Sequence, residues 1–292
     1  MSSGPAQPVV LVIEPSVTDP VERLGEWLVD AGVSLDVRRA AEPGAIPADA
    51  EGIAGIVVMG GPMGANDDAD YPWLGEVKAL LRDAVSREVP TLGVCLGGQL
   101  LAAANGGRVE RNPEGPEIGA QLVAKRSTAA QDPLFGPMPI TPDVIQWHYD
   151  AITALPPGAL QLASSPGADN QAFRLGRLAW GLQFHIETTP ERVASWADSD
   201  PQLAEYDLTR VVERSTAAHD DIEETWRPFA AAFAEIVRDP SSVAPPRAVP
   251  TSSAAPITDP AAIRAALAAE VAGSRSTLPM PQLRRPEDDP SS

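Results

Sequence analysis

The sequence predicts a three-layer α/β fold, doubly wound around a mostly parallel sheet, with an antiparallel extension at one edge and a disordered C-terminal tail. Short apolar runs rich in β-branched residues alternate with amphipathic segments of helical period. Parallel neighbours need a crossover connection, so this alternation indicates parallel strands joined by helices. Short strand-like pieces follow in the middle of the chain, and Pro, Ala and Ser dominate from residue 240 onward.

The first third of the chain holds the predicted parallel strands and their helices. Residues 9–13 form an apolar run typical of a buried strand. A helix follows over 21–31, with Trp27 and Leu28 on its apolar face and Gly32 as its C-terminal cap. The same patterns predict, in chain order, a strand at 33–37, a strand at 56–59, a helix at 74–85, a strand at 91–94 and a helix at 98–104.

The middle of the chain predicts the antiparallel addition, and helix returns after it. Short strand-like pieces lie at 121–123, 144–147, 160–162 and 178–184, and residues 190–238 are predicted to be helical. The whole arrangement is flavodoxin-like.

Residues 1–239 are predicted to form one domain and 240–292 a separate tail. The tail contains no Trp, Tyr or Phe, so it has too little apolar surface to offset the entropy of ordering it. Within it, Asp259 and Pro260 are typical of the start of a helix, and a short helix is predicted over 259–272. A partner-binding peptide in the tail is the alternative to a simple solvated segment.

Composition excludes several classes of function. The 292 residues carry 40 Asp and Glu against 22 Lys and Arg, and a formal charge of −18 disfavours binding to a nucleic-acid backbone. No apolar run approaches the ~18 residues of a membrane-spanning helix, and the N-terminus lacks the features of a secretory signal. One cysteine allows neither an internal disulfide nor a structural zinc site. We expect a soluble cytoplasmic protein without nucleic-acid or membrane partners, and without a metal or organic cofactor.

The most informative segment, residues 90–100, contains that cysteine. A predicted strand ends just before Cys95, and Gly97 and Gly98 open an apolar helix. This pattern is typical of a nucleophile elbow, a tight turn that holds a side chain above the sheet edge. The helix N-terminus favours a thiolate, and the N–H of Leu96 would face the oxygen of an attacked carbonyl. Lone cysteines are more often small buried apolar residues, but the carboxyl end of a strand favours a nucleophile.

A thiol nucleophile needs a base and a group that orients the base, and the chain has three histidines. His185 directly follows an apolar strand, and alternation along an extended chain puts Glu187 on the same side. We therefore predict His185 as the base and Glu187 as its orienting group, with a structural histidine as the alternative. His148 is the rival base or part of the pocket lining. His219, among acidic residues, is expected on a solvated helix face.

A glycine-rich loop, Gly60-Gly61-Pro62, also lies just past a buried strand. Its backbone N–H groups can point into the cleft and bind an oxyanion. It has neither the Lys-Ser/Thr ending of a phosphate-binding loop nor the spacing of a dinucleotide fingerprint. An ordinary turn is the equally weighted alternative.

With these residues in place, the sequence resembles the class I glutamine amidotransferase domain of the triad type. The resemblance runs over about residues 8–238 and is greatest to stand-alone, GMP-synthase-like proteins. Three motifs carry it: residues 93–99 around the cysteine, 60–62 in the glycine loop and 181–187 around His185.

The resemblance implies a mechanism. Cys95 would attack the side-chain amide of glutamine, with His185 as base and then acid and Glu187 orienting it. Gly61 and Leu96 would donate N–H groups to the oxyanion. Ammonia would leave, a γ-glutamyl thioester would remain on Cys95, and water would release glutamate.

The resemblance also suggests substrate-binding residues, and two positions depart from the family pattern. Gln99 would contact the amino-acid end of glutamine, with Gly60, His148 and Tyr149 as further candidates. Tyr149 replaces the glycine of the family's His-Gly-Asp segment, which leaves the identity of the γ-glutamyl substrate open. Ile186 stands where proline is usual, and proline contributes no chemistry there.

Three functions are compatible with these residues. The first is a glutaminase or amidotransferase component that supplies ammonia to a separate synthase or ligase. The second is a γ-glutamyl hydrolase or peptidase, which would use the same thiol and base on other γ-glutamyl amides. The third is a non-catalytic interaction protein, against which the intact set of Cys95, His185 and Glu187 argues.

Overall fold

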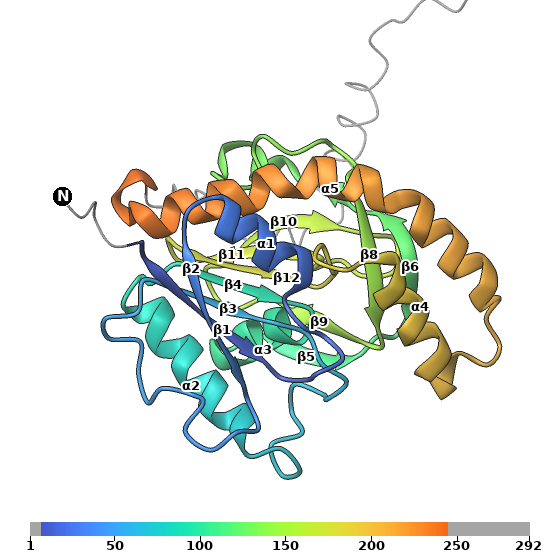
Figure 1. Ribbon diagram of the computed structural model, residues 1–292, viewed down its shortest axis with the longest axis horizontal. Coiled ribbons are helices and arrows are strands. Elements are labelled where there is room, and N and C mark those ends of the chain that lie inside the picture. Colours follow the sequence, from blue (N-terminus) through green and yellow to red (C-terminus); the bar gives the residue numbers. More distant parts are fainter. Residues whose placement is uncertain (1–6, 245–292) are drawn as a thin grey trace, which may run out of the picture. The chain divides into compact units, whose positions relative to one another are not determined.

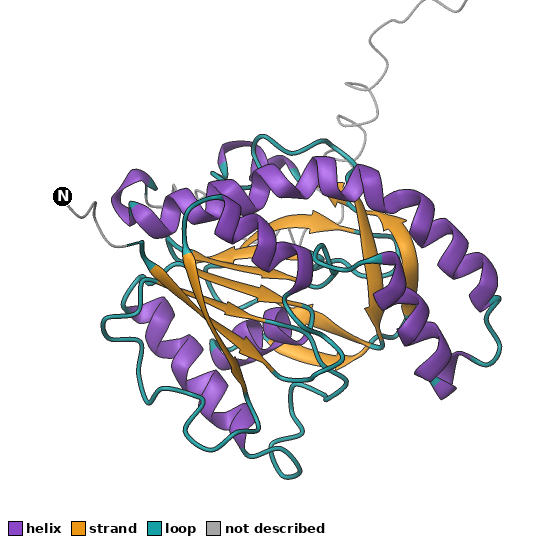
Figure 2. Cartoon of the chain, in the orientation of Figure 1, coloured by secondary structure: helices purple, strands orange, loops and turns teal. Residues whose placement is uncertain are grey.

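The computed structural model describes residues 7–244, which are built around an eight-stranded sheet (Figures 1 and 2). The strand order is β2-β1-β3-β4-β12-β11-β10-β7. The parallel strands are β2 (Ser34–Arg39), β1 (Val9–Glu14), β3 (Gly55–Val58), β4 (Thr91–Val94) and β12 (Ala179–Leu182). The antiparallel strands at one edge are β11 (Ala172–Leu175), β10 (Leu160–Ser164) and β7 (Ala124–Lys125). The predicted mostly parallel sheet with an antiparallel edge is confirmed.

The sheet forms here because its central strands are apolar on both faces. In β1, Val10 and Val12 enter one core cluster, whereas Leu11 and Ile13 enter the other. This alternation follows from the two-residue period of a strand. A strand buried on both faces needs a helical layer on each side, and the crossover connections supply it.

Two helices cover each face of the sheet. Figure 1 shows α1 (Glu22–Asp30) and α5 (Leu208–Arg238) on one side, and α2 (Trp73–Ser86) and α3 (Leu96–Ala104) on the other. Trp27 and Trp226 belong to the core under α1 and α5, and Leu81 and Leu100 to the core under α2 and α3. Gly32 ends α1 with a φ of 90°, as predicted.

Two antiparallel ribbons lie outside the large sheet. They pair β5 (Arg108–Arg111) with β9 (Asp150–Ala154), and β6 (Glu117–Leu122) with β8 (Asp143–His148). The predicted pieces at 121–123 and 144–147 therefore belong to a ribbon rather than to the sheet edge. Strands β5, β7, β9 and β11 were not expected from the sequence.

The helical region after residue 190 is interrupted. It consists of α4 (Pro190–Ser199), a 3-10 turn η2 (Pro201–Leu203) and the long α5. Thr189 caps α4 by accepting a hydrogen bond from Arg192 N, and Asp207 caps α5 by accepting one from Arg210 N. The other 3-10 turns are η1 (Ser127–Gln131) and η3 (Pro240–Ser242). Within residues 7–244, no helix has both the length and the apolarity needed to cross a membrane.

The last described residues are held against the domain. The guanidinium of Arg177 donates to the carbonyl oxygens of Pro240 and Val243, and Arg174 donates to that of Ala244. Residues 240–244, which were grouped with the tail, thus contact the antiparallel edge. The predicted helix at 259–272 lies outside the described residues, and the boundary at 239/240 stays a prediction.

Candidate active site

Cys95 occupies a strained turn between β4 and α3. Its φ of 51° and ψ of −110° are rare for a residue with a side chain. The N–H of Cys95 donates to the carbonyl oxygen of Leu182 at 2.8 Å, which fixes the turn to the end of β12. The side chain is 6% exposed and forms no disulfide. The turn therefore holds the sulfur at the carboxyl edge of the parallel strands.

Glycines let α3 lie directly on the strand backbones. A Cβ atom at Gly97 would be 2.0 Å from the carbonyl oxygen of Val58, and one at Gly98 would be 2.4 Å from that of Leu182. No side chain fits such distances, because the obstacle is backbone. The helix therefore begins immediately after Cys95, and the N–H of Leu96 in its first turn has no intrahelical acceptor.

His185 and Glu187 form a buried pair beyond the end of β12. His185 exchanges two backbone hydrogen bonds with Ile145, at 2.8 and 3.1 Å, and these keep the segment extended. The Nδ1 atom of His185 lies 2.6 Å from Oε1 of Glu187. The other oxygen, Oε2, accepts a hydrogen bond from the N–H of Ile186 at 2.9 Å. A proline at position 186 could not donate this bond.

The electrostatics of this pair favour an imidazolium. Burial alone lowers the pKa of His185, but the charges of Glu187 and Cys95 outweigh burial and hold the pKa well above that of an ordinary histidine. Because Nδ1 faces Glu187, Nε2 is the nitrogen left to exchange a proton with the sulfur. The ring of Trp196 packs against the imidazole, with ring centroids 4.8 Å apart.

The glycine-rich loop after β3 reaches both His185 and α3. A Cβ atom at Gly60 would be 2.9 Å from Cε1 of His185, and one at Gly61 would be 3.2 Å from Cδ2 of Leu96. The loop therefore passes close to the imidazole on one side and to the start of α3 on the other. The structure brings together the predicted nucleophile, base, orienting carboxylate and both predicted oxyanion donors.

A cavity of about 620 Å³ opens next to Cys95. Of the predicted residues, it is lined by Gly61, Gln99, His148 and Tyr149. The amide nitrogen of Gln99 donates to the carbonyl oxygen of Asp150 at 3.1 Å and to Oε1 of Gln183 at 3.3 Å. Gln99 is thus held in one orientation at the cavity wall.

His148 is placed as a structural residue of this wall. Its Nδ1 lies 2.8 Å from the carbonyl oxygen of Asp150, and its Nε2 lies 3.2 Å from Oε2 of buried Glu117. Burial raises the pKa of Glu117, but the nearby His148 ring and hydrogen bonds from Ser165 and Gln171 outweigh it and lower the pKa on balance. Both ring nitrogens of His148 therefore face groups other than Cys95.

Tyr149 closes the cavity on another side. Its hydroxyl donates to Oδ2 of Asp200 at 2.6 Å, and the guanidinium of Arg111 lies 4.6 Å from the centre of its ring. Burial, with a further contribution from the hydrogen bond to Asp200, raises the pKa of Tyr149, so the phenol stays protonated. Trp147 also donates to Asp200, at 3.3 Å, and this ties the β8–β9 turn to the end of α4.

The prediction for His219 is wrong. The side chain is 2% exposed, with Nδ1 2.6 Å from the carbonyl oxygen of Ser215 and Nε2 3.3 Å from Oγ1 of Thr188. Burial lowers its pKa. Ser215, His219, Ile222 and Trp226 are spaced by three and four residues and all face the core. That spacing was the signal for burial, and the acidic neighbours obscured it.

Sequence reasoning missed several residues of the cavity wall. Asp19, Arg111, Trp196 and Asp200 all line it. For Asp19 a signal existed, because it follows β1 and the carboxyl ends of parallel strands share one edge of a sheet. The others come from a ribbon and from the end of α4, whose positions depend on tertiary packing.

Two further features of the described residues bear on ligands. Residues 7–244 contain no group of three or more His, Cys, Asp or Glu side chains able to hold a metal ion.

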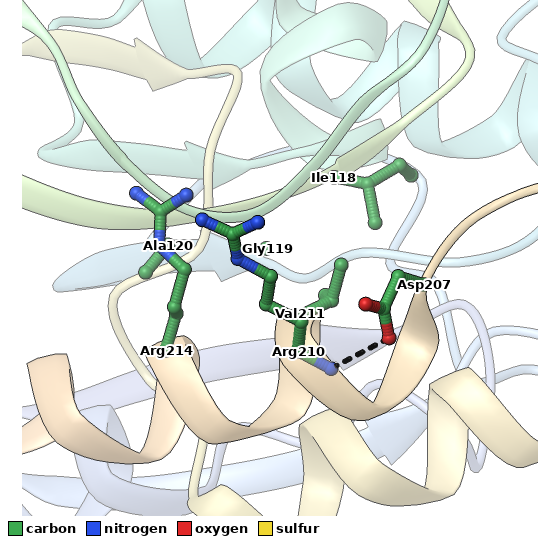
Figure 3. Close-up of a pocket in the computed structure, with 7 residues that line it drawn as sticks. All are labelled: Ile118, Gly119, Ala120, Asp207, Arg210, Val211 and Arg214. Atoms are coloured by element: carbon green, nitrogen blue, oxygen red, sulfur yellow. Dashed lines mark hydrogen bonds between the residues drawn. The ribbon is translucent and has the colours of Figure 1, made fainter.

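A second cavity, of about 310 Å³, lies between β6 and the start of α5. Figure 3 shows Arg210 and Arg214 projecting from α5 toward the strand that carries Gly119. This cavity lacks a nucleophile and is not the candidate catalytic site.

Comparison with known proteins places the chain in a family. The model of the family described as glutamine amidotransferase class-I matches residues 20–195. The chain belongs to this family. Class-I glutamine amidotransferases hydrolyse the side-chain amide of glutamine and transfer the ammonia.

The matches to related sequences cover different shares of those proteins. A putative glutamine amidotransferase-like protein, YfeJ of Salmonella typhimurium, is 30% identical over 171 residues, which are 58% of this chain and 71% of that protein. The glutamine-hydrolyzing GMP synthase of Porphyromonas gingivalis is 33% identical over 144 residues. That match covers 49% of this chain but 26% of the synthase, so the resemblance is to one part of the larger enzyme.

Solved structures of amidotransferases match most of the chain. A glutamine amidotransferase from Methylobacillus flagellatus is 31% identical, covers 82% of this chain and 97% of its own, and has a TM-score of 0.68. One from Thermotoga maritima is 27% identical, with coverages of 79% and 99% and a TM-score of 0.68. These amidotransferases share the α/β architecture described above.

Proposed function

We propose that the chain hydrolyses the side-chain amide of glutamine through a γ-glutamyl thioester on Cys95 and supplies the ammonia to a separate synthase or ligase. The observation that carries this proposal is the position of Cys95. Its sulfur lies on a strained turn, beside the buried pair of His185 and Glu187 and at the wall of a cavity. Because the single thiol must stay reduced, we place the reaction in the cytoplasm.

The first half-reaction acylates Cys95. The thiolate adds to the amide carbon, and the electron pair of the carbonyl bond moves to oxygen. The N–H groups of Gly61 and Leu96 donate hydrogen bonds to the resulting oxyanion. The oxyanion then reforms the carbonyl, the carbon–nitrogen bond breaks, and the nitrogen takes the proton from Nε2 of His185. Ammonia leaves, and a thioester and a neutral imidazole remain.

The second half-reaction releases glutamate. Nε2 of His185 takes a proton from water as the water oxygen adds to the thioester carbon. The intermediate collapses, the carbon–sulfur bond breaks, and the thiolate and imidazolium are restored. Glu187 supports both halves, because its carboxylate stabilises the charged ring each time the ring holds the extra proton.

The wall of the cavity supplies the proposed substrate contacts. Gln99 and Tyr149 lie along it, and Gly60 allows the loop after β3 to approach His185. We assign Gln99 to the amino-acid end of glutamine, and His148 to holding this wall in place.

A γ-glutamyl hydrolase acting on larger amides is the second candidate. The cavity volume of about 620 Å³ is in the middle of the range of small-molecule sites. It leaves room for a substituent on the amide nitrogen.

Covalent labelling tests the proposal. The purified protein is treated with a diazo-ketone analogue of glutamine, with and without glutamine as competitor, and the labelled peptide is identified by mass spectrometry. We expect one label, on Cys95, and protection by glutamine. Cys95→Ala provides the control, because it removes the only thiol in the chain. Labelling that glutamine does not slow, or glutamine hydrolysis that survives Cys95→Ala, would overturn the assignment.

The alternative is separated by a turnover assay. Weak glutamine hydrolysis that a synthase partner stimulates supports the ammonia-supplying component. Rapid cleavage of γ-glutamyl peptides or γ-glutamyl amines by the protein alone supports the hydrolase.

A further inference from the structure

Asp19 is a second buried carboxylate of the candidate active site, with no role in the mechanism above. It lies in the turn between β1 and α1, is 8% exposed, and lines the same cavity as Cys95. The indole N–H of Trp196 donates to the carbonyl oxygen of Thr18 at 3.0 Å and so holds this turn in place. Trp196 also packs against His185, so one side chain positions both the base and the turn.

The carboxylate of Asp19 is only partly satisfied. Oδ2 accepts a hydrogen bond from Oγ1 of Thr18 at 2.5 Å, but no described residue donates to Oδ1. The residue as a whole is 8% exposed, but Oδ1 itself keeps contact with solvent. Burial raises the pKa of Asp19, and the attraction of His185 only partly offsets this. Because Asp19 lines the cavity, this accessible oxygen is an acceptor that a bound substrate can contact in place of water.

The position of the free oxygen identifies which part of the ligand it meets. The point at which a Cβ atom of Gly60 would stand is 3.1 Å from Oδ1 of Asp19 and 2.9 Å from Cε1 of His185. The free oxygen and the imidazole thus flank the same backbone position. In amide hydrolysis, the leaving nitrogen is the substrate atom that approaches the imidazole, because it takes the proton from Nε2.

We propose that Asp19 binds the leaving nitrogen of the γ-glutamyl amide, through a hydrogen bond from a substrate N–H to its free Oδ1. This inference rests on the proposed amide hydrolysis at Cys95. The nitrogen gains positive charge as it accepts the proton of His185 and separates from carbon. A fixed carboxylate beside it stabilises that charge more in the transition state than in the bound substrate. No proton passes to Asp19, and the bonds formed and broken are those given above.

The role predicts a preference for amides over esters. The leaving oxygen of glutamate γ-methyl ester carries no hydrogen when the thiolate attacks, so it cannot donate to Asp19. Asp19→Asn keeps the size of the side chain and an acceptor for Thr18, but removes the charge. We expect kcat/KM for glutamine to fall about tenfold or more beyond any fall for the ester, because a loss that acts through the charge of His185 is shared by both substrates. The amide-to-ester ratio is therefore the diagnostic quantity.

A matched control removes another carboxylate from the same cavity. Oδ2 of Asp67 accepts a hydrogen bond from the N–H of Gly64 at 2.7 Å. Asp67→Asn is expected to leave the amide-to-ester ratio unchanged. Because Asp19→Asn removes a buried, poorly compensated charge, its melting temperature at pH 7.5 is expected to equal or exceed that of the wild type.

The outcomes distinguish a failure of the role given to Asp19 from a failure of the proposed amide hydrolysis at Cys95. If the wild type cleaves both substrates and Asp19→Asn slows both equally, Asp19 does not contact the leaving nitrogen, although the proposed function stands. A lower melting temperature with equal losses on both substrates would give Asp19 a structural role instead. If the wild type cleaves neither substrate, the proposed function itself fails.

Discussion

Replacing Glu187 by glutamine is expected to lower the reactivity of Cys95 by about 10- to 100-fold at pH 7. Both carboxylate oxygens are engaged, by Nδ1 of His185 at 2.6 Å and by the N–H of Ile186 at 2.9 Å. A glutamine side chain has one acceptor oxygen, so its NH₂ group must face a donor. The imidazolium then loses a hydrogen bond to a charged group, worth about 1.5–3 kcal/mol.

The sign of the effect follows from the pKa of His185. Burial favours the neutral ring, and the charge of Glu187 is the largest of the influences that overcome it. Without that charge the pKa of His185 falls, the ring holds its proton less often at pH 7, and the thiolate beside it is less favoured. Glutamine hydrolysis is expected to fall by a similar factor, because the same ion pair begins the reaction.

The assay uses the one cysteine of the chain. The rate of alkylation by iodoacetamide, followed by intact mass, reports on Cys95 without interference from other thiols. Glu191→Gln is the matched control, since Glu191 is an exposed carboxylate in the first turn of α4. Equal alkylation rates for the wild type and Glu187→Gln at pH 7, with both variants folded, would refute the view that Glu187 sets the charge of the imidazole.

Three other variants test the fold around the site. Gly97→Ala should lower the free energy of unfolding by about 2 kcal/mol or more in a denaturant titration, because its Cβ would meet the carbonyl oxygen of Val58 at 2.0 Å; unchanged stability would contradict the close packing of α3. Ile186→Pro removes the N–H that binds Glu187 but installs the usual residue of the family, so kcat/KM should stay within about threefold of that of Ile186→Val, which keeps the bond; a loss of about tenfold would show that this bond is needed here. Burial lowers the pKa of His219, so wild-type stability is full above the ordinary histidine pKa of about 6.5 and is lost as the pH falls below it. The difference in melting temperature between the wild type and His219→Gln should therefore shrink from pH 7.5 to pH 5, and a constant difference would contradict a buried neutral ring.

The parallel part of the fold was predictable because its strands are apolar on both faces and bounded by amphipathic helices. Strand β4 has the predicted bounds, and α3 begins two residues earlier than expected, at Leu96. The missed strands carry weaker signals. In β5, Arg108–Arg111, only Val109 is buried. In β11, Arg174 is buried because Asp132, 3.5 Å away, and the ring of Trp180 accompany it, and neither partner can be located from local sequence.

The residues of the candidate site also fall into those that the sequence could predict and those that it could not. Residues that follow the ends of parallel strands, such as Cys95 and His185, could be proposed from sequence because one rule places them at one edge. The role of Tyr149 could not, since its hydroxyl partner, Asp200, is 51 residues away and belongs to the end of α4. Asp19 obeys the strand-end rule, but only its place in the cavity wall beside His185 singles it out.

The contact between α3 and the strand backbones has a consequence for how variants of this chain would behave. The carbonyl oxygens of Val58 and Leu182 lie too close to Gly97 and Gly98 for either glycine to carry a Cβ atom. Contact between backbones therefore sets the position of α3 on the sheet, and with it the position of the Cys95 sulfur. Repacking of the surrounding apolar side chains would therefore change melting behaviour while leaving the geometry of the reacting atom intact. The scaffold should accept stabilising core substitutions without loss of turnover, provided that the two glycines are kept.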